Sequence, residues 1–535
     1  VNHSSKMNLP SQSILSKLPE KSLLQAILDL ARSESIRLYI VGGTVRDIIL
    51  GRKIYDVDFA IPGDAISFAK KLAELTKAKA IILDEIQNSA RVIYNRGEFY
   101  MDFSAIRGDD IIADLRVRDL TINAIAYDFQ QLLESNEVEL MDPCNGLNDL
   151  NDKLIRFTST QVIIDDPIRM LRALRFSASL DFTIPDQILS SIQIFSCLIN
   201  SVAVERTRDE LYKILNVHNS IKYIRLINDI GLLDYIFPEI TKMRGVEQNE
   251  YHHLDVWEHS LLTLEFLEQN VSALVCENIQ KSPLIPLFQR GKLNSPFGKG
   301  GKGGFKNDTS IIPESMINHL PEINKYLNEE VVKERSKLAL LKLTALFHDI
   351  GKPSAKSIDE KGRIRFFDHH QKGAELALII GSRLKLANRE SQFMSNVILY
   401  HMYPLTLITK YKRNRTSPRE KKHDALKFIK KVGDDCLGVL LISYADLQAT
   451  QGPLRTDEDL RIMDDLIAEI TDIYFIEMEK SIPPLLTGVD IMKEFKLPPS
   501  PIIGEIIKSV REAQLSKKIK TRQEAIELAK EIFKR

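Results

Sequence analysis

Two short segments near the amino-terminal end of the chain combine glycines with carboxylates. Gly42 and Gly43 open the segment GGTVRD, and the segment Asp-Val-Asp with Asp56 and Asp58 follows it. A Gly-Gly turn that opens a helix lets the backbone approach a polyphosphate, and the helix N-terminus offers unpaired N–H groups with a partial positive charge. On a strand, Asp56 and Asp58 would point to the same face. Adjacent carboxylates repel one another unless a cation lies between them, and their hard oxygen atoms favour Mg²⁺.

A third carboxylate, Asp102, falls on a later predicted strand. Two Mg²⁺ ions held by Asp56, Asp58 and Asp102 would activate an attacking hydroxyl and neutralise a leaving pyrophosphate. A lone Gly-Gly turn or a lone Asp-x-Asp is usually structural. Their order here, in a strand, turn, helix and second strand, instead predicts a phosphoryl-transfer site.

An arginine-rich segment follows at 165–176. Arg169, Arg172 and Arg175 recur every third residue, so they fan over about a third of the circumference of a helix. The residues alone favour a helix face with internal ion pairs, since Asp166 and Arg169 are i,i+3 neighbours.

The segments VGGTVRDIILG and DVDFA together resemble the signature of the class II tRNA nucleotidyltransferase and poly(A) polymerase family. The segment RDLTINA at 118–124 resembles the RDFTxNA motif of that family, and DPCNG at 142–146 resembles its DPxGG hinge. The resemblance implies a template-independent enzyme that uses Mg²⁺, CTP and ATP to build or repair the 3′ end of tRNA.

The resemblance also implies a role for each matching residue. Arg118, Asp119 and Asn123 would position the sugar and phosphates of the nucleotide. Asp166 and Arg169 would pair with the base edge of CTP or ATP, because an aspartate offers acceptors and an arginine offers donors. The complete set implied to bind the nucleotide is Gly42, Gly43, Arg46, Arg118, Asp119, Asn123, Asp166, Arg169, Arg172 and Arg175.

The connection between Asp102 and Arg118 bears on which nucleotides are added. Arg118 follows Asp102 by only 16 positions. Family members that add the full CCA sequence usually carry a longer flexible loop there, and a short connection resembles members that add only CC. Addition of CC alone and addition of CCA both remain open, with poly(A) polymerase as a further alternative.

A second candidate site lies in the carboxyl-terminal half. The motif His-Asp-Ile-Gly-Lys at 348–352, with a distant upstream His and a distant downstream Asp, resembles the HD metal-dependent phosphohydrolase superfamily. The implied ligands are His259, His348, Asp349, His369, His401 and Asp446. Imidazole ligands suit Mn²⁺, Ni²⁺, Co²⁺ or Zn²⁺.

The HD site has a catalytic and a structural interpretation. As a catalyst it would hydrolyse a phosphomonoester or a 2′,3′-cyclic phosphate at an RNA end. Two alternative functions of another class remain open. One is an RNA-end phosphohydrolase whose head domain only binds RNA, and the other is a tRNA-binding protein without catalytic activity.

The elements that must position these sites change type along the chain. Strand signals at 37–41, 57–61, 80–83, 91–94 and 99–103 alternate with helical ones, which predicts an α/β head with a small mixed sheet. From about residue 165 the spacing is helical, which predicts an all-α body, and the resemblance to the HD superfamily implies that this body includes an HD domain. The predicted division is a helical extension at 1–35, the head at 36–156, a helical neck at 157–245, the HD domain at 246–450 with a flexible glycine-rich insertion at about 280–320, and a tRNA-binding tail at 451–535.

The composition limits the function classes. The 535 residues hold 73 basic and 73 acidic side chains, and the net charge of zero excludes a uniformly basic coat protein for nucleic acids. Four widely spaced cysteines form no CxxC pair, and no apolar run reaches about 18 residues. We therefore expect a multidomain cytoplasmic protein without membrane spans. The family resemblance implies tRNA, CTP and ATP as its partners.

Overall fold

The computed structural model divides into two compact units. It describes residues 8–95, 99–281, 314–414, 416–481, 484–498, 500–515 and 518–534. The first unit comprises Val1–Asn249, Leu254–Glu268 and Asn328–Ser395, and the second comprises Glu250–His253, Gln269–Leu327 and Asn396–Arg535. Most of the predicted glycine-rich insertion lies outside the described residues, as does the start of the amino-terminal extension. The predicted domain boundaries stay a prediction.

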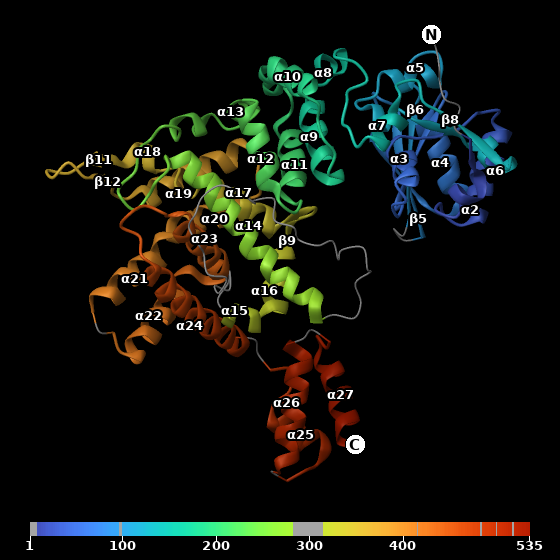
Figure 1. Ribbon diagram of the computed structural model, residues 1–535. Helices are drawn as coiled ribbons and strands as arrows, with labels where there is room; N and C mark the ends of the chain where they lie inside the picture. Colours follow the sequence, from blue (N-terminus) through green and yellow to red (C-terminus); the bar gives the residue numbers. More distant parts are fainter. Residues whose placement is uncertain are drawn as a thin grey trace. The chain divides into compact units, whose positions relative to one another are not determined.

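The head, blue to cyan in Figure 1, contains a mixed sheet. This sheet has eight strands in the order β1-β8-β7-β2-β3-β6-β5-β4. Among the described strands of this sheet, β3 and β6 form the one parallel pair. The strands are β1 (Asn8–Pro10), β2 (Tyr39–Val41), β3 (Asp56–Ile61), β4 (Lys79–Asp84), β5 (Ser89–Tyr94), β6 (Phe99–Ala105), β7 (Ala126–Asp128) and β8 (Glu137–Met141). The α/β head is confirmed, while β1, β7 and β8 were not predicted.

The two faces of this sheet are covered differently. On one face Phe59 and Phe103 stack at 5.0 Å, and Phe68 of α4 (Ala65–Thr76) packs 5.3 Å from Phe103. On the opposite face, Ile111 and Leu115 of α5 (Ile111–Arg116) pack in a cluster with residues of β2, β3 and β7. This second face also carries Asp56, Asp58 and Asp102, and its side chains on β5 and β6 stay partly exposed.

Short helices bring the remaining motifs of the head to the sheet. The helices are α1 (Ser11–Leu15), α2 (Lys21–Ser33), α3 (Gly42–Ile49), η2 (Thr121–Asn123), α6 (Phe129–Glu134) and α7 (Gly146–Asn151). Gly146 begins α7, and a Cβ atom there would lie 2.1 Å from the carbonyl oxygen of Thr121. Only glycine therefore lets α7 approach η2, the turn that carries Asn123.

The rest of the first unit is mainly helical, which confirms the predicted helical body. The neck helices are α8 (Gln161–Asp165), α9 (Ile168–Leu180), α10 (Asp186–Phe195), η3 (Ser196–Ser201), α11 (Val204–Leu215), α12 (Ser220–Asp229), α13 (Leu232–Ile236) and η4 (Pro238–Lys242). They precede α14 (Val256–Lys281), β9 (Glu330–Val332), β10 (Arg335–Ser336), α17 (Lys337–Phe347), α18 (Lys352–Ala355), β11 (Lys356–Ile358), β12 (Ile364–Phe366), α19 (His369–Arg383) and α20 (Asn388–Tyr400). Helices α14 and α20 begin in this unit and end in the second. The two short hairpins, β9-β10 and β11-β12, were not predicted.

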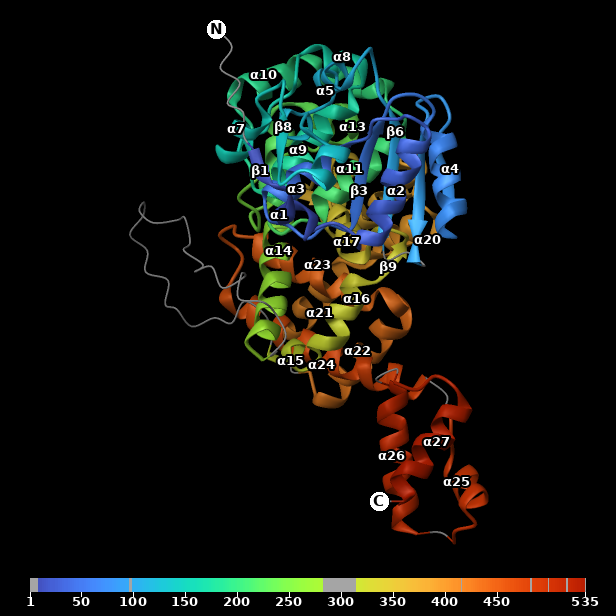
Figure 2. The same cartoon turned by 90° about the vertical axis from the view of Figure 1, so that its right-hand side faces the viewer.

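The second unit is helical where it is described. Its helices are α15 (Glu314–Asn318), α16 (Leu320–Asn328), α21 (Met402–Arg413), α22 (Pro418–Val432), η6 (Gly433–Asp435), α23 (Cys436–Ala449), α24 (Asp457–Ser481), α25 (Gly488–Phe495), α26 (Pro501–Leu515) and α27 (Arg522–Lys534). The last three helices lie side by side (Figure 2). They share an apolar cluster that includes Ile491, Ile506 and Ala525. No described helix is long and apolar enough to cross a membrane.

Candidate active site and candidate metal site

The three predicted carboxylates of the head lie on one face of two neighbouring strands. In the parallel pair of β3 and β6, Asp58 lies opposite Asp102 and Asp56 lies opposite Tyr100. Burial, and then the charges of Asp56 and Asp102, raise the pKa of Asp58 to about 6. A divalent cation bound here would relieve this repulsion, and a set of carboxylate oxygens fits the ligand preference of Mg²⁺.

The start of α3 lies directly against Asp58. Gly42 has a φ of +67°, a backbone conformation that L-side chains rarely adopt. A Cβ atom on Gly43 would lie 3.3 Å from Oδ2 of Asp58. The backbone N–H of Asp58 donates a 2.8 Å hydrogen bond to Oγ1 of Thr44. The predicted Gly-Gly turn is therefore held next to the carboxylates, where no larger residue fits without displacing a neighbour.

A chain of hydrogen bonds connects α3 to the neck. Arg46 Nη1 donates to Asn123 Oδ1 at 2.8 Å, Asn123 donates to Asp119 at 3.3 Å, and Arg172 Nε donates to Asp119 at 2.8 Å. Burial acts to raise the pKa of Asp119, but the Arg172 guanidinium and these hydrogen bonds hold it at about 2. Asp119 is therefore an ionised group that connects the head to α9.

Arg118 and Arg175 are each held by a buried carboxylate. Arg118 Nε donates to Asp114 at 2.9 Å, and Arg175 pairs with Glu210 at 2.7 Å. A Cβ atom on Gly42 would lie 3.0 Å from Arg118 Nη1, so this guanidinium also lies beside the glycine turn. Buried carboxylates therefore fix the positions of Arg118 and Arg175, two of the predicted nucleotide-binding arginines.

Phe176 is a residue of this site that the sequence argument missed. The guanidinium carbon of Arg175 lies 3.9 Å from the centre of its ring, that of Arg46 lies at 5.0 Å, and that of Arg172 at 5.8 Å. Cations over an aromatic face are attracted to its quadrupole. In the sequence Phe176 is one more apolar residue on a helix, so no signal distinguished it from the core.

Asp166 and Arg169, the predicted base-selecting pair, have separate partners. Both oxygens of Asp166 accept hydrogen bonds from Arg206, at 3.0 and 2.7 Å, and Arg169 donates to the carbonyl of Val162 at 3.3 Å. The bidentate pair fixes the plane of the Asp166 carboxylate. Arg206 was not among the predicted site residues, and the base-selecting role of Asp166 and Arg169 stays a prediction.

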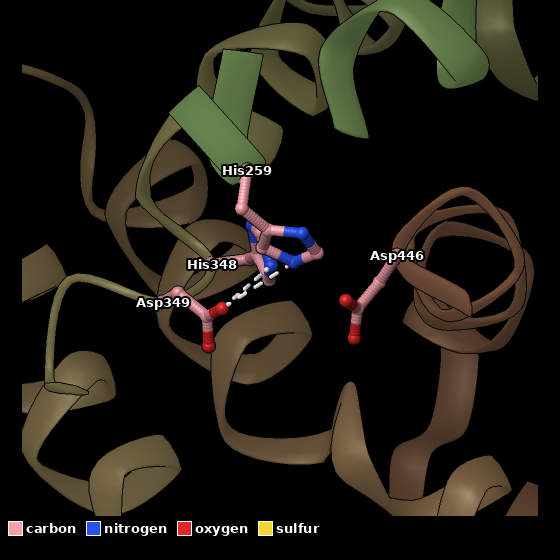
Figure 3. Close-up of side chains that lie close together, drawn as sticks. All are labelled: His259, His348, Asp349 and Asp446. Carbon is pink, nitrogen blue, oxygen red and sulfur yellow. Dashed lines mark ion pairs between the residues drawn. The ribbon is translucent and has the colours of Figure 1, made fainter. Parts of the chain in front are cut away.

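The second site is a buried cluster of histidines around Asp349. Figure 3 shows the side chains of His259, His348 and Asp349 facing one another, and their possible ligand atoms lie within 4.8 Å of one another. The Nε2 atoms of His259 and His348 lie 3.6 Å and 3.2 Å from Oδ2 of Asp349, respectively. The Nε2 atom of His369 lies 3.5 Å from Oδ1 of Asp349. Buried imidazoles around a carboxylate fit a transition metal such as Mn²⁺, Ni²⁺, Co²⁺ or Zn²⁺.

Backbone contacts orient two of these rings. Nδ1 of His348 is 2.8 Å from the carbonyl oxygen of Ala345, and Nδ1 of His369 is 2.8 Å from that of Phe366. Because a carbonyl only accepts, Nδ1 must carry the proton, which leaves Nε2 of each ring as a ligand atom.

Lys352 adds a buried cation beside Asp349 that the prediction of ligands did not include. Its Nζ lies 2.6 Å from Oδ2 of Asp349. Burial acts to raise the pKa of Asp349, but Lys352 and the histidines hold it well below its usual value. Asp349 is thus available as an ionised ligand. His401 and Asp446 are both buried and lie in the second unit, and their part in the site stays a prediction.

Family models match four segments of the chain. The Poly A polymerase head domain matches residues 38–156, and the model described as "Probable RNA and SrmB- binding site of polymerase A" matches 181–243. The HD domain matches 315–446, and a tRNA nucleotidyltransferase domain matches 464–529.

The chain is similar to curated proteins over almost its whole length. An A-adding tRNA nucleotidyltransferase of Deinococcus radiodurans is 29% identical, over 91% of this chain and 93% of the relative. A CC-adding tRNA nucleotidyltransferase of Thermus thermophilus is 25% identical, over 91% of each chain. The solved structure of the Thermotoga maritima CCA-adding enzyme complexed with tRNA covers 98% of each chain at 18% identity, with a TM-score of 0.54. At that identity the likeness extends to the fold alone.

Proposed function

Because the chain belongs to the tRNA nucleotidyltransferase and poly(A) polymerase family, we propose that it transfers CMP, alone or followed by AMP, from CTP and ATP to the 3′ end of tRNA. One observation carries this proposal. Asp56, Asp58 and Asp102 share one face of the sheet, and Asp58 lies against the glycine turn that opens α3. This arrangement can hold cations beside a triphosphate.

In the proposed reaction the tRNA 3′-hydroxyl attacks the α-phosphate of the nucleotide and pyrophosphate leaves. Asp56 and Asp58, with Asp102, would hold Mg²⁺, which when bound lowers the pKa of the attacking hydroxyl and neutralises charge on the pyrophosphate. The glycine turn brings backbone N–H groups to the phosphates. Arg118 and Arg172 add positive charge on the same side, each held in place by a buried aspartate.

Base selection is proposed for the neck. Asp166 offers acceptors and Arg169 offers donors, which match the base edges of cytosine and adenine. Arg206 holds Asp166 through both oxygens and would thereby keep its acceptors in one plane. We expect Arg206→Ala to lower the discrimination between CTP and UTP more than it lowers the rate with CTP.

The number of nucleotides added separates the proposed specificities. The short connection from Asp102 to Arg118 contains α5, whose Ile111 and Leu115 are buried. This supports CC addition, and full CCA addition and poly(A) synthesis are the alternatives. The likeness to the Deinococcus relative makes addition of A alone a further alternative. The test offers labelled CTP and ATP, separately and together, to tRNA that ends before the first C, after CC, and after CCA. No incorporation on any substrate would refute the proposal.

A second activity is proposed for the histidine cluster around Asp349. His259, His348 and His369 surround the buried, ionised carboxylate of Asp349. The three imidazoles and this carboxylate together match the donor set of a metal-dependent phosphohydrolase. The expected substrate is a phosphomonoester or a 2′,3′-cyclic phosphate at an RNA end. His401 and Asp446 are proposed as further ligands from their places in the sequence.

Paired variants separate the two activities. Asp58→Ala should abolish nucleotide incorporation and leave phosphate release intact, and His348→Ala should do the reverse. If either variant removed both activities while the protein stayed folded, the model of two independent sites would be wrong. Phosphate release without incorporation in the unmodified protein would instead support an RNA-end phosphohydrolase, and neither activity would support a tRNA-binding protein.

A further inference from the structure

The catalytic face of the head sheet extends beyond the carboxylates onto β5 and β6. Arg91 on β5 lies opposite Asp102 in the antiparallel pair. Its Nε and Nη2 donate to the two oxygens of Asp102, each at 2.7 Å. Its guanidinium carbon also lies 5.3 Å from the centre of the Tyr100 ring. The proposed chemistry so far uses neither Arg91 nor Tyr100.

This part of the face is open to a ligand. Arg91, Tyr100 and Asp102 point to the same side as Asp56 and Asp58, because residues in register or two apart share a face. All three are partly exposed. The helix that covers this face, α5, packs with residues of β2, β3 and β7. The face over β5 and β6 is therefore available to solvent in the described part of the head.

The position of the nucleotide indicates what this surface receives. The glycine turn follows β2, and Asn123 precedes β7, so the residues proposed to hold the triphosphate lie on the β2 and β7 side of Asp58. Arg91 and Tyr100 lie on the other side, on β5 and β6. An in-line displacement needs the attacking hydroxyl and the leaving pyrophosphate on opposite sides of the phosphorus atom. The RNA strand that carries the 3′-hydroxyl must then approach from the side of the sheet formed by β5 and β6.

We propose that Arg91 and Tyr100 form the seat of the last nucleotide of the RNA strand whose 3′-hydroxyl attacks. This inference rests on the proposed nucleotidyltransferase function. Tyr100 would stack on the terminal base, as aromatic side chains do with unpaired bases. Asp102 fixes the guanidinium of Arg91 through Nε and Nη2, and we assign Nη1 to an oxygen of the RNA backbone.

The charge of Arg91 also makes this approach electrostatically feasible. Three carboxylates on one face would repel a polyanionic strand. Arg91 balances Asp102, the carboxylate nearest to the open side, and so removes part of that repulsion where the strand arrives.

The test compares the KM for tRNA with the KM for the nucleotide. In Arg91→Ala and in Tyr100→Leu, we expect the KM for tRNA to rise at least about fivefold, because the first loses one charged hydrogen bond to the RNA backbone and the second loses one stacking contact. The KM for CTP should stay within about twofold, since these residues lie away from the triphosphate side. Tyr100→Phe keeps the ring and should keep the KM for tRNA.

A direct probe and a matched control accompany these variants. With 2-aminopurine as the last nucleotide of the tRNA, binding to the unmodified protein should quench its fluorescence, and Tyr100→Leu should lose that quenching. Arg37 offers a similar arrangement elsewhere in the head: its Nε pairs with one oxygen of Asp128, and its guanidinium carbon lies 5.7 Å from the centre of the Tyr39 ring. Arg37→Ala should change neither KM.

The outcomes separate this inference from the function on which it rests. If the unmodified protein incorporates no nucleotide, the proposed function fails. If it incorporates nucleotides while Arg91→Ala and Tyr100→Leu leave the KM for tRNA unchanged, or raise both KM values equally, only the proposed RNA seat fails. A fall in kcat with both KM values unchanged would likewise reduce Arg91 to a support for Asp102 and overturn the inference.

Discussion

Replacement of Asp58 by asparagine should stabilise the head when no metal is present. Burial and the neighbouring Asp56 and Asp102 raise the pKa of Asp58 from an ordinary value of 3.8 to about 6. A carboxyl whose folded-state pKa is raised stabilises the fold fully below its unfolded pKa, and that contribution is lost as pH rises through the folded pKa. The gap between the two values corresponds to ~3 kcal/mol at pH 8. Asp58→Asn removes the charge and should recover about that amount.

Amide hydrogen exchange measures this change within the head alone. Exchange at Val57 and Phe59 on β3, with EDTA at pH 8, reports the opening free energy of the sheet without contributions from the other parts of the chain. Asp58→Asn should slow exchange at pH 8, and the gain should shrink at pH 4, where Asp58 is already largely protonated. It should also shrink in Mg²⁺, because a bound cation relieves the same repulsion in the unmodified protein.

Asp102→Asn is the matched control and should stabilise the head far less than Asp58→Asn. Arg91 holds both oxygens of Asp102, so the change removes an ion pair together with the repulsion that Asp102 exerts on Asp58. The pair is partly exposed, and its loss should cost about 1 kcal/mol or less. If Asp58→Asn proved no more stable than the unmodified head in EDTA at pH 8, the electrostatic account of the site would be refuted.

Three further predictions concern single positions. Asp119→Asn should destabilise the protein by ~2 kcal/mol at pH 7, because the pKa of Asp119 is held at about 2; urea unfolding should show the loss above pH 4 and its disappearance as pH falls to 2. Gly43→Ala places a Cβ atom 3.3 Å from Asp58 Oδ2, so titration of incorporation with Mg²⁺ should show a half-maximal concentration that is about tenfold higher. Gly351→Ala places a Cβ atom 2.0 Å from the carbonyl oxygen of His369, so metal analysis should show loss of the bound transition metal, with nucleotide incorporation retained.

The sequence predicted those strands of the head whose side chains carry a clear apolar signal. The predicted range 57–61 corresponds to β3, and 91–94 lies within β5. Strand β7 was not predicted because it has only three residues, all buried, and shows no alternation between apolar and polar positions. The helical body was predictable because amphipathic helices repeat their apolar spacing over several turns.

The site was predictable where its residues are neighbours in sequence and unpredictable where strand register brings them together. Asp56 and Asp58 are two apart on one strand, so their shared face follows from the period of the strand. Arg91 meets Asp102 only because β5 and β6 pair in one particular register, and no local pattern specifies that register. Arg206 on α11 meets Asp166 at the end of α8 across 40 positions through the packing of helices, which no local pattern specifies either.

Three aspartates of the nucleotide site differ in their counter-charge, and this difference indicates an order of events. Asp119 is paired with Arg172 and Asp102 with Arg91, whereas burial and the neighbouring carboxylates raise the pKa of Asp58. A cation therefore gains most at Asp58, where it relieves repulsion without displacing an arginine. We expect the first Mg²⁺ to bind at Asp58 before RNA arrives. Because Arg91 holds Asp102 through Nε and Nη2, we expect Asp102 to join as a ligand through the lone pairs that Arg91 leaves free, while Nη1 of Arg91 contacts a phosphate of the arriving RNA strand.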